Sequence, residues 1–157
     1  MNRASVVKAI IVILIFSGLT VYTAEVSAQV IGCSVSVSPL RFGSIRLPLT
    51  QPAAGQGSVT VTCEEGLGYE VSLNQGLHYI HPMRSVQRED GVERIGYTVH
   101  QDANYQTFWG DGTQMGPVKA VVGSGTPQEN TVYARLWAMG NFPAGRYTDL
   151  MTVTVQF

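Results

Sequence analysis

Histidines are the side chains of this sequence that could bind a metal ion, and they are poorly placed for it. The three histidines are His78, His81 and His100. His78 and His81 are close in sequence, but they lie in a loop with a proline, and no carboxylate or cysteine stands nearby at a fitting spacing. The sequence therefore predicts no metal site and no cofactor.

Catalysis needs a nucleophile with its base, or an acid paired with a base, and the spacing of residues offers neither. The motifs H-E-x-x-H and G-x-S-x-G do not occur in the sequence. Asp102, Asp111 and Asp149 stand at turn-like positions, where an aspartate commonly hydrogen-bonds its own backbone. We therefore expect no catalytic residue and a protein that is not an enzyme.

The N-terminal segment has the features of a secretory signal peptide. Basic residues flank the start of an apolar run, 9–19, that is about half as long as the ~20 residues of a membrane-spanning helix. Small residues at 26–28 then form a cleavage site. We expect residues 1–28 to be removed and residues 29–157 to form one secreted domain; an uncleaved membrane anchor is the alternative.

The two cysteines, Cys33 and Cys63, both fall in the part of the chain that is predicted to be secreted. Oxidising compartments convert such an even pair to a disulfide. Two ligands of a metal site are the alternative, but no C-x-x-C pattern or third ligand accompanies them. The pair therefore favours a disulfide. The formal net charge is −1, without a basic stripe, so a nucleic-acid partner is not expected.

Most of the sequence after residue 32 alternates between apolar and polar residues, the pattern of half-buried β-strands. Strands are predicted at 33–38, 57–64, 69–73, 94–100, 131–137 and 148–157, with a weaker one at 117–122. The first strand is expected to stop at Pro39. Short strands between glycine- and proline-rich turns predict an immunoglobulin-like two-sheet sandwich, with both cysteines on inward faces.

The last predicted strand ends with the printed sequence, and this raises the possibility of an incomplete fold. Its inward face carries Met151, Val153, Val155 and Phe157. A sandwich of about six strands lacks the seventh of an immunoglobulin fold, which leaves an apolar groove and an unpaired edge. A strand from another molecule can fill such a groove. From periodicity alone, a complete sandwich with a self-paired last strand is equally compatible.

Four stretches in order resemble the spore coat protein U domain family, which includes subunits of archaic chaperone–usher pili. They read CSVSVSPLRFGSI, TVTCEEGLGYEVSLNQG, RIGYTVHQDANYQTFWGDGT and TVYARLWAMGNFPAGRYTDLMTVTVQF. The resemblance implies a noncatalytic, incomplete immunoglobulin-like β-sandwich that lacks its final strand. It also implies secretion through the periplasm to the cell surface, as part of an adhesive, biofilm-forming pilus or a surface coat.

The resemblance further implies partners. A periplasmic chaperone would lend a strand to the groove beside the terminal strand and deliver the subunit to an outer-membrane usher. The N-terminal extension of another pilin subunit would then replace the chaperone's strand. In this reading Met151, Val153, Val155 and Phe157 form the acceptor edge.

The sequence departs from that family pattern before its first cysteine. Polymerising members resemble one another in an alternating apolar donor extension, whereas only residues 29–32 precede Cys33 here. Four residues reach about 13 Å, which is shorter than a typical strand. We therefore expect a subunit that accepts a strand but donates none, at the tip of a fibre. The alternative is a self-contained secreted coat or surface-binding domain that does not polymerise.

Aromatic and apolar residues in loops suggest a contact surface. Trp109, in WGDGT, is expected in the core, because tryptophan is mostly buried. The connection LWAMGNFP is unusually apolar, and its Trp137, Met139 and Phe142 are the candidates for contact with an abiotic or host surface.

Overall fold

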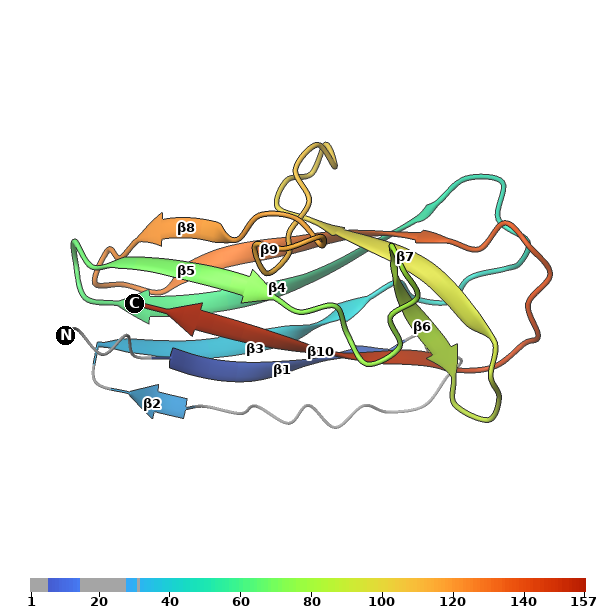
Figure 1. Ribbon diagram of the computed structural model, residues 1–157, viewed down its shortest axis with the longest axis horizontal. Helices are drawn as coiled ribbons and strands as arrows, with labels where there is room; N and C mark the ends of the chain where they lie inside the picture. Colours follow the sequence, from blue (N-terminus) through green and yellow to red (C-terminus); the bar gives the residue numbers. More distant parts are fainter. Residues whose placement is uncertain (1–5, 15–27, 31) are drawn as a thin grey trace.

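The computed structural model describes residues 6–14, 28–30 and 32–157, and this part of the chain is all β, without a helix. Its strands run along the length of the molecule (Figure 1). They are β1 (Val6–Leu14), β2 (Ala28–Val30), β3 (Cys33–Arg41), β4 (Ala53–Cys63), β5 (Gly68–Leu73), β6 (Arg84–Arg88), β7 (Arg94–His100), β8 (Lys119–Val122), β9 (Gln128–Trp137) and β10 (Tyr147–Gln156). The described residues contain no helix of the length and apolarity that crossing a membrane requires.

The strands follow one another in the order β1-β3-β4-β9-β7-β6-β10-β5-β8, and β2 pairs with β3. Each described pair is antiparallel except β1–β3. β10 pairs with β6 at Tyr147 and Thr148, and with β5 from Val153 to Gln156. Because β1 pairs with both β3 and β10, the path closes on itself from β1 to β10, and β5 and β8 continue beyond β10.

The core is built from alternating residues, as the sequence predicts. Along β5, β10, most of β9 and the second half of β4, every second residue is buried. These side chains pack in one hydrophobic cluster that includes Val61, Val71, Leu136 and Val153. Cys33 and Cys63 face each other across β3 and β4 and form the predicted disulfide. The predicted all-β sandwich with one disulfide is therefore confirmed.

The strand boundaries differ from the prediction in three places. β3 continues through Pro39 to Arg41, because the β3–β4 pairing shifts between Ser38 and Arg41 and so does not need the missing N–H of proline. β4 begins at Ala53, within a segment of expected turn residues that pairs with β9. β6 was not predicted at all. Its sequence is RSVQR, and its buried residues are the polar Arg84 and Ser85 and a single apolar residue, Val86.

Trp109 closes one side of the sandwich. Its indole is fully buried, as expected, and Nε1 donates to the carbonyl of Val71 in β5 over 2.9 Å. Its backbone N–H donates to the carbonyl of Val99 in β7, also over 2.9 Å. The loop that carries Trp109 therefore joins β5 to β7, which belong to opposite halves of the core.

Loss of the disulfide should destabilise the fold through the unfolded chain. The bridge spans a sequence separation of 30 residues. In the chain-entropy model it adds about 3–4 kcal/mol to the free energy of unfolding. Urea unfolding of the oxidised chain and of the double variant Cys33→Ala/Cys63→Ala measures this difference, and equal midpoints would contradict it.

Candidate functional site

The candidate site is the edge of β10 that faces β3. On its other edge, β10 is hydrogen-bonded along its whole length by segments of the same domain. β5 pairs with its C-terminal half and β6 with its first two residues. Between them, the N–H of Asn74 donates to Thr152 O over 3.1 Å, and the N–H of Leu77 donates to Leu150 O over 3.0 Å. This side of β10 is therefore complete.

The edge of β10 toward β3 is paired by β1. Nine residue pairs run antiparallel from Val6 opposite Gln156 to Leu14 opposite Thr148. Leu14 of β1 also pairs with Arg41 of β3, so β1 borders β10 along its length and β3 at its end. Within the described residues, β1 is the sole strand on this edge. The chain's own N-terminal strand, β1, thus occupies the place beside β10 where the sequence predicted an open groove.

Three of the four predicted acceptor residues lie under this strand. Met151, Val153 and Val155 are fully buried and stand opposite residues of β1 in the register. Phe157 lies beyond the end of β10 and is half-buried. A side chain at Gly32 would come within 3.0 Å of its ring, so Phe157 packs against the backbone just before Cys33. The structure therefore separates Phe157 from the other three residues.

Asp149 is part of the site, contrary to the expectation of a turn. It lies within β10, only 2% exposed. Its Oδ1 accepts the N–H groups of Leu77 and His78 over 2.9 and 3.0 Å, and its Oδ2 accepts the hydroxyl of Tyr97 over 2.7 Å. Three donors make a buried carboxylate tolerable. The sequence contained a signal, because Asp149 shares the inward parity of Met151.

Two further polar side chains, the buried Arg84 and the half-buried Asn74, fix the loop after β5 to the middle of β10. Arg84 donates from Nε to Asn74 O and from Nη2 to Leu73 O, each over 2.8 Å. The Oδ1 of Asn74 accepts the N–H of Thr152 over 2.8 Å, as a neighbouring strand would. Gly76 has φ +82°, and a Cβ there would collide with the Asp149 carboxylate, so glycine is required.

The electrostatics of this cluster keep its hydrogen bonds in one state near neutral pH. Burial, together with the charge and hydrogen bond of Asp149, raises the pKa of Tyr97 well above its usual value. Tyr97 therefore keeps its proton and remains a donor. Burial lowers the pKa of Arg84, while Tyr97, Asp111 and Asp149 act in the opposite direction.

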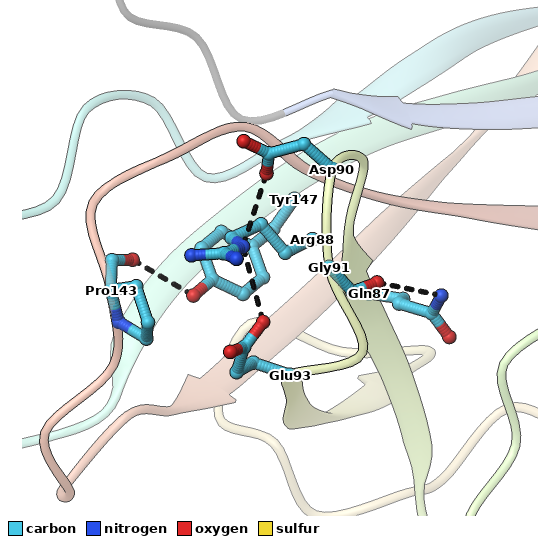
Figure 2. Close-up of polar contacts among 7 residues, drawn as sticks. All are labelled: Gln87, Arg88, Asp90, Gly91, Glu93, Pro143 and Tyr147. Atoms are coloured by element: carbon cyan, nitrogen blue, oxygen red, sulfur yellow. Dashed lines mark hydrogen bonds and ion pairs between the residues drawn. The ribbon is translucent and has the colours of Figure 1, made fainter.

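A second cluster holds the start of β10 (Figure 2). The hydroxyl of Tyr147 donates to Pro143 O over 2.9 Å, which closes the loop before β10. Arg88, opposite Tyr147 in the ladder, contacts Asp90 Oδ1 over 3.0 Å and Glu93 Oε2 over 3.1 Å through Nε. Burial raises the pKa of Tyr147. The β6–β7 hairpin and the loop before β10 are thereby fixed side by side.

The three candidates for surface contact lie in different environments. Trp137 and Met139 are 39% and 51% exposed, whereas Phe142 is half-buried against the core. Trp137 lines a cavity of about 540 Å³ together with Met83, Phe108 and Met115 from other parts of the chain. Sequence reasoning missed these three partners. Their single apolar side chains in separate loops carry no periodic signal.

The histidine loop is used structurally in the described part of the chain. His81 Nδ1 and the hydroxyl of Tyr79 are hydrogen-bonded over 2.8 Å, and His78 contributes its backbone N–H to Asp149. Across the described ranges, no three side chains of His, Cys, Asp and Glu are grouped in a way that could hold a metal ion.

Comparison with known proteins gives this architecture a class. One match is the crystal structure of the CsuC–CsuE chaperone–tip adhesion subunit pre-assembly complex, from archaic chaperone–usher Csu pili of Acinetobacter baumannii. Its TM-score is 0.55 and its identity 20%, over 80% of this chain and 40% of that one. The AfaE-3 adhesin from Escherichia coli matches with a TM-score of 0.51 and 12% identity, over 99% of this chain and 97% of that one. The fold is therefore the immunoglobulin-like sandwich of adhesin subunits.

The family follows from the sequence itself. The profile of the Spore Coat Protein U domain matches residues 19–154, so this protein belongs to the Spore Coat Protein U domain family, as the resemblance predicted. No curated protein matches the sequence. The chain spans less than half of the Acinetobacter chain that it matches.

Removal of the Asp149 hydrogen bonds should destabilise β10 in a graded way. Tyr97→Phe removes one hydrogen bond to a charged group and should lower the free energy of unfolding by about 1.5–3 kcal/mol. Asp149→Ala leaves the His78 N–H and the Tyr97 hydroxyl without their acceptor, while the Leu77 N–H keeps Leu150 O, and it should cost more. Tyr133→Phe, on a half-buried ring, should change it by less than about 0.5 kcal/mol. Denaturant unfolding gives the ranking, and equal effects of all three variants would contradict it.

Proposed function

We propose that this protein is a secreted structural subunit of a chaperone–usher pilus or surface fibre, and that it accepts a donor strand between β3 and β10. The observation that carries the proposal is the edge of β10, which is complete on one side and is paired on the other only by β1 among the described residues. Residues 6–14 fall within the segment predicted to be removed on secretion. Removal would leave the groove open to a strand from another molecule.

The partners in this proposal are a periplasmic chaperone, an outer-membrane usher and other pilin subunits. Family membership and the likeness to a chaperone-bound tip adhesion subunit support them. A sandwich with an open apolar edge aggregates unless it is covered, so a chaperone strand would be needed in the periplasm. The protein would then reach the cell surface within a fibre or coat, in a role that involves no catalysis.

A position at the fibre tip is the finer part of the proposal. After cleavage at residue 28, residues 29–32 would be too short for a donor strand. In addition, Ala28–Val30 pair with Cys33–Val35 of β3, so this segment folds back onto its own domain. The predicted cleavage site itself lies largely outside the described residues, because residues 26 and 27 are not among them.

A self-contained secreted coat or surface-binding domain is the second candidate. The occupied position between β3 and β10 favours it, because a chain that retains Val6–Leu14 has no open edge there. Such a chain would be stable without a chaperone. The two candidates therefore differ in whether residues 29–157 can fold without an added strand.

The first experiment adds a strand to the domain. Residues 29–157 are secreted to the periplasm alone, or with a C-terminal Asn-Gly turn followed by a strand of alternating threonine and valine, which can form a hairpin with β10. We expect a soluble, folded monomer with the extension and aggregation or degradation without it. A third version, in which serine replaces each valine, keeps the length but loses the apolar face and should behave like the domain alone.

Gel filtration and thermal unfolding give the readout of this comparison. If the domain without an extension accumulates as a folded monomer with the same unfolding temperature, the donor-strand proposal is wrong and the self-contained domain is correct.

The second experiment tests the contact surface. Trp137→Ser and Met139→Ser should each reduce adsorption of the strand-completed domain to a polystyrene surface several-fold, because both side chains are exposed and apolar. Val122→Ser is the matched control, since Val122 is 62% exposed on β8, outside the connection that carries Trp137 and Met139, and its replacement should leave adsorption unchanged if that connection is the contact surface. Phe142 is left unchanged because it packs against the core. Equal adsorption of all variants would remove the contact role.

A further inference from the structure

We infer that the N-terminal segment Val6–Leu14 is an intramolecular donor strand, which closes the acceptor groove while it is attached and opens it when it is cut away. The inference rests on the proposed function, because it concerns the same groove. It assigns a second role to residues that the sequence marks as part of a secretion signal. The pairing of β1 with β10 and β3, the register of that pairing, and the length of chain between β1 and β2 each support the inference.

The register of β1 matches its sequence to the two faces of β10. Residues 7, 9, 11 and 13 stand opposite Val155, Val153, Met151 and Asp149, all of them buried. Residues 6, 8, 10, 12 and 14 stand opposite residues of β10 that are exposed or half-buried. Directly opposed residues of an antiparallel pair share a face. The buried positions of β10 therefore face Val7, Ala9, Ile11 and Ile13 in the ladder.

Lys8 selects this register over its neighbours. It is the only charged residue of β1, and its partner is Thr154, on the outward parity of β10. A slip by one residue would place the lysine opposite Val153 or Val155, at the buried positions. An unpaired ammonium group in an apolar core is strongly unfavourable. The strand is thus apolar where the groove is buried and charged where it is not.

The chain is long enough for the segment to reach the groove of its own domain. β1 ends beside Arg41, and β2 begins beside Val35, six residues back along β3. That distance is about 20 Å. The 13 residues from 15 to 27 can extend to about 43 Å. Cis pairing therefore needs no second molecule.

Attachment determines which strand occupies the groove. A segment on a short flexible linker acts at an effective concentration of about 1 mM. A strand of equal intrinsic affinity supplied at micromolar concentration would be excluded about a thousandfold until the linker is cut. Proteolysis between residues 15 and 28 then becomes the event that makes the subunit competent for a chaperone or neighbouring strand.

The test uses the full chain with the recognition site of a specific protease inserted after Ala24, refolded with its disulfide formed. The probe is a fluorescent synthetic peptide of residues 6–14 with lysines added at both ends for solubility. Before cleavage we expect almost no incorporation of the probe. After cleavage, incorporation should increase at least about 100-fold as the probe exchanges with the released segment. Equal incorporation before and after cleavage overturns the inference.

Two neighbouring isoleucines provide matched variants of the uncut chain. Ile11→Asp places a carboxylate opposite Met151, at a buried position, and should open the groove so that the probe binds without cleavage. Ile10→Asp makes the same change opposite the half-buried Thr152 and should leave the groove closed. Equal probe binding by both variants overturns the inference, because closure of the groove would then not depend on the register of β1 on β10.

The same assay separates this inference from the proposed function. The threonine–valine strand, as a free peptide, is the second probe. If the cut chain takes up neither peptide and remains a folded monomer, the acceptor function itself fails. If the uncut and cut chains take up the threonine–valine peptide equally well, the acceptor function stands and only the role of Val6–Leu14 fails.

Discussion

One edge of β10 is the constraint on which the rest of this structure depends. A strand in the middle of a sandwich needs hydrogen-bond partners on both sides, because unpaired backbone groups beside an apolar core are costly. β5, the loop after it and β6 supply one side. The other side depends on β1. The two proposed functions differ in whether β1 remains attached to the domain or is removed on secretion.

The buried polar cluster explains how β10 can keep a defined edge. Asp149, Asn74 and Arg84 tie the loop after β5 to the middle of β10, on the edge opposite β1, where no regular strand pairs with β10 in the described part of the chain. On the far side of the core, Trp109 joins β5 to β7. The two halves of the sandwich are thus held together on that side by the domain itself. The position between β3 and β10 is filled by β1, and it is there that the proposed function places a strand from another molecule.

Alternation predicted most of the strands and the buried face of β10, because a half-buried strand repeats every two residues. The even pair of cysteines in a chain predicted to be secreted indicated the disulfide. β6 was missed since Val86 is its only apolar residue, and a buried arginine satisfied by carbonyls looks like a surface residue in sequence. The partners of Trp137 were missed because tertiary folding alone brings Met83, Phe108 and Met115 together. The occupant of the groove was missed because an apolar N-terminal run indicates secretion first.

The composition of the apolar N-terminal run bears on its proposed role as a strand that fills the groove beside β10. Secretion requires only an apolar segment, which leucine and alanine would supply as well. Instead, residues 10–13 are Ile, Ile, Val and Ile, four consecutive β-branched residues. Such residues favour the extended backbone of a strand over a helix. In the register, β1 then pairs with nine of the ten residues of β10 and is apolar at every position except Lys8. A segment selected for export alone has no need of that match.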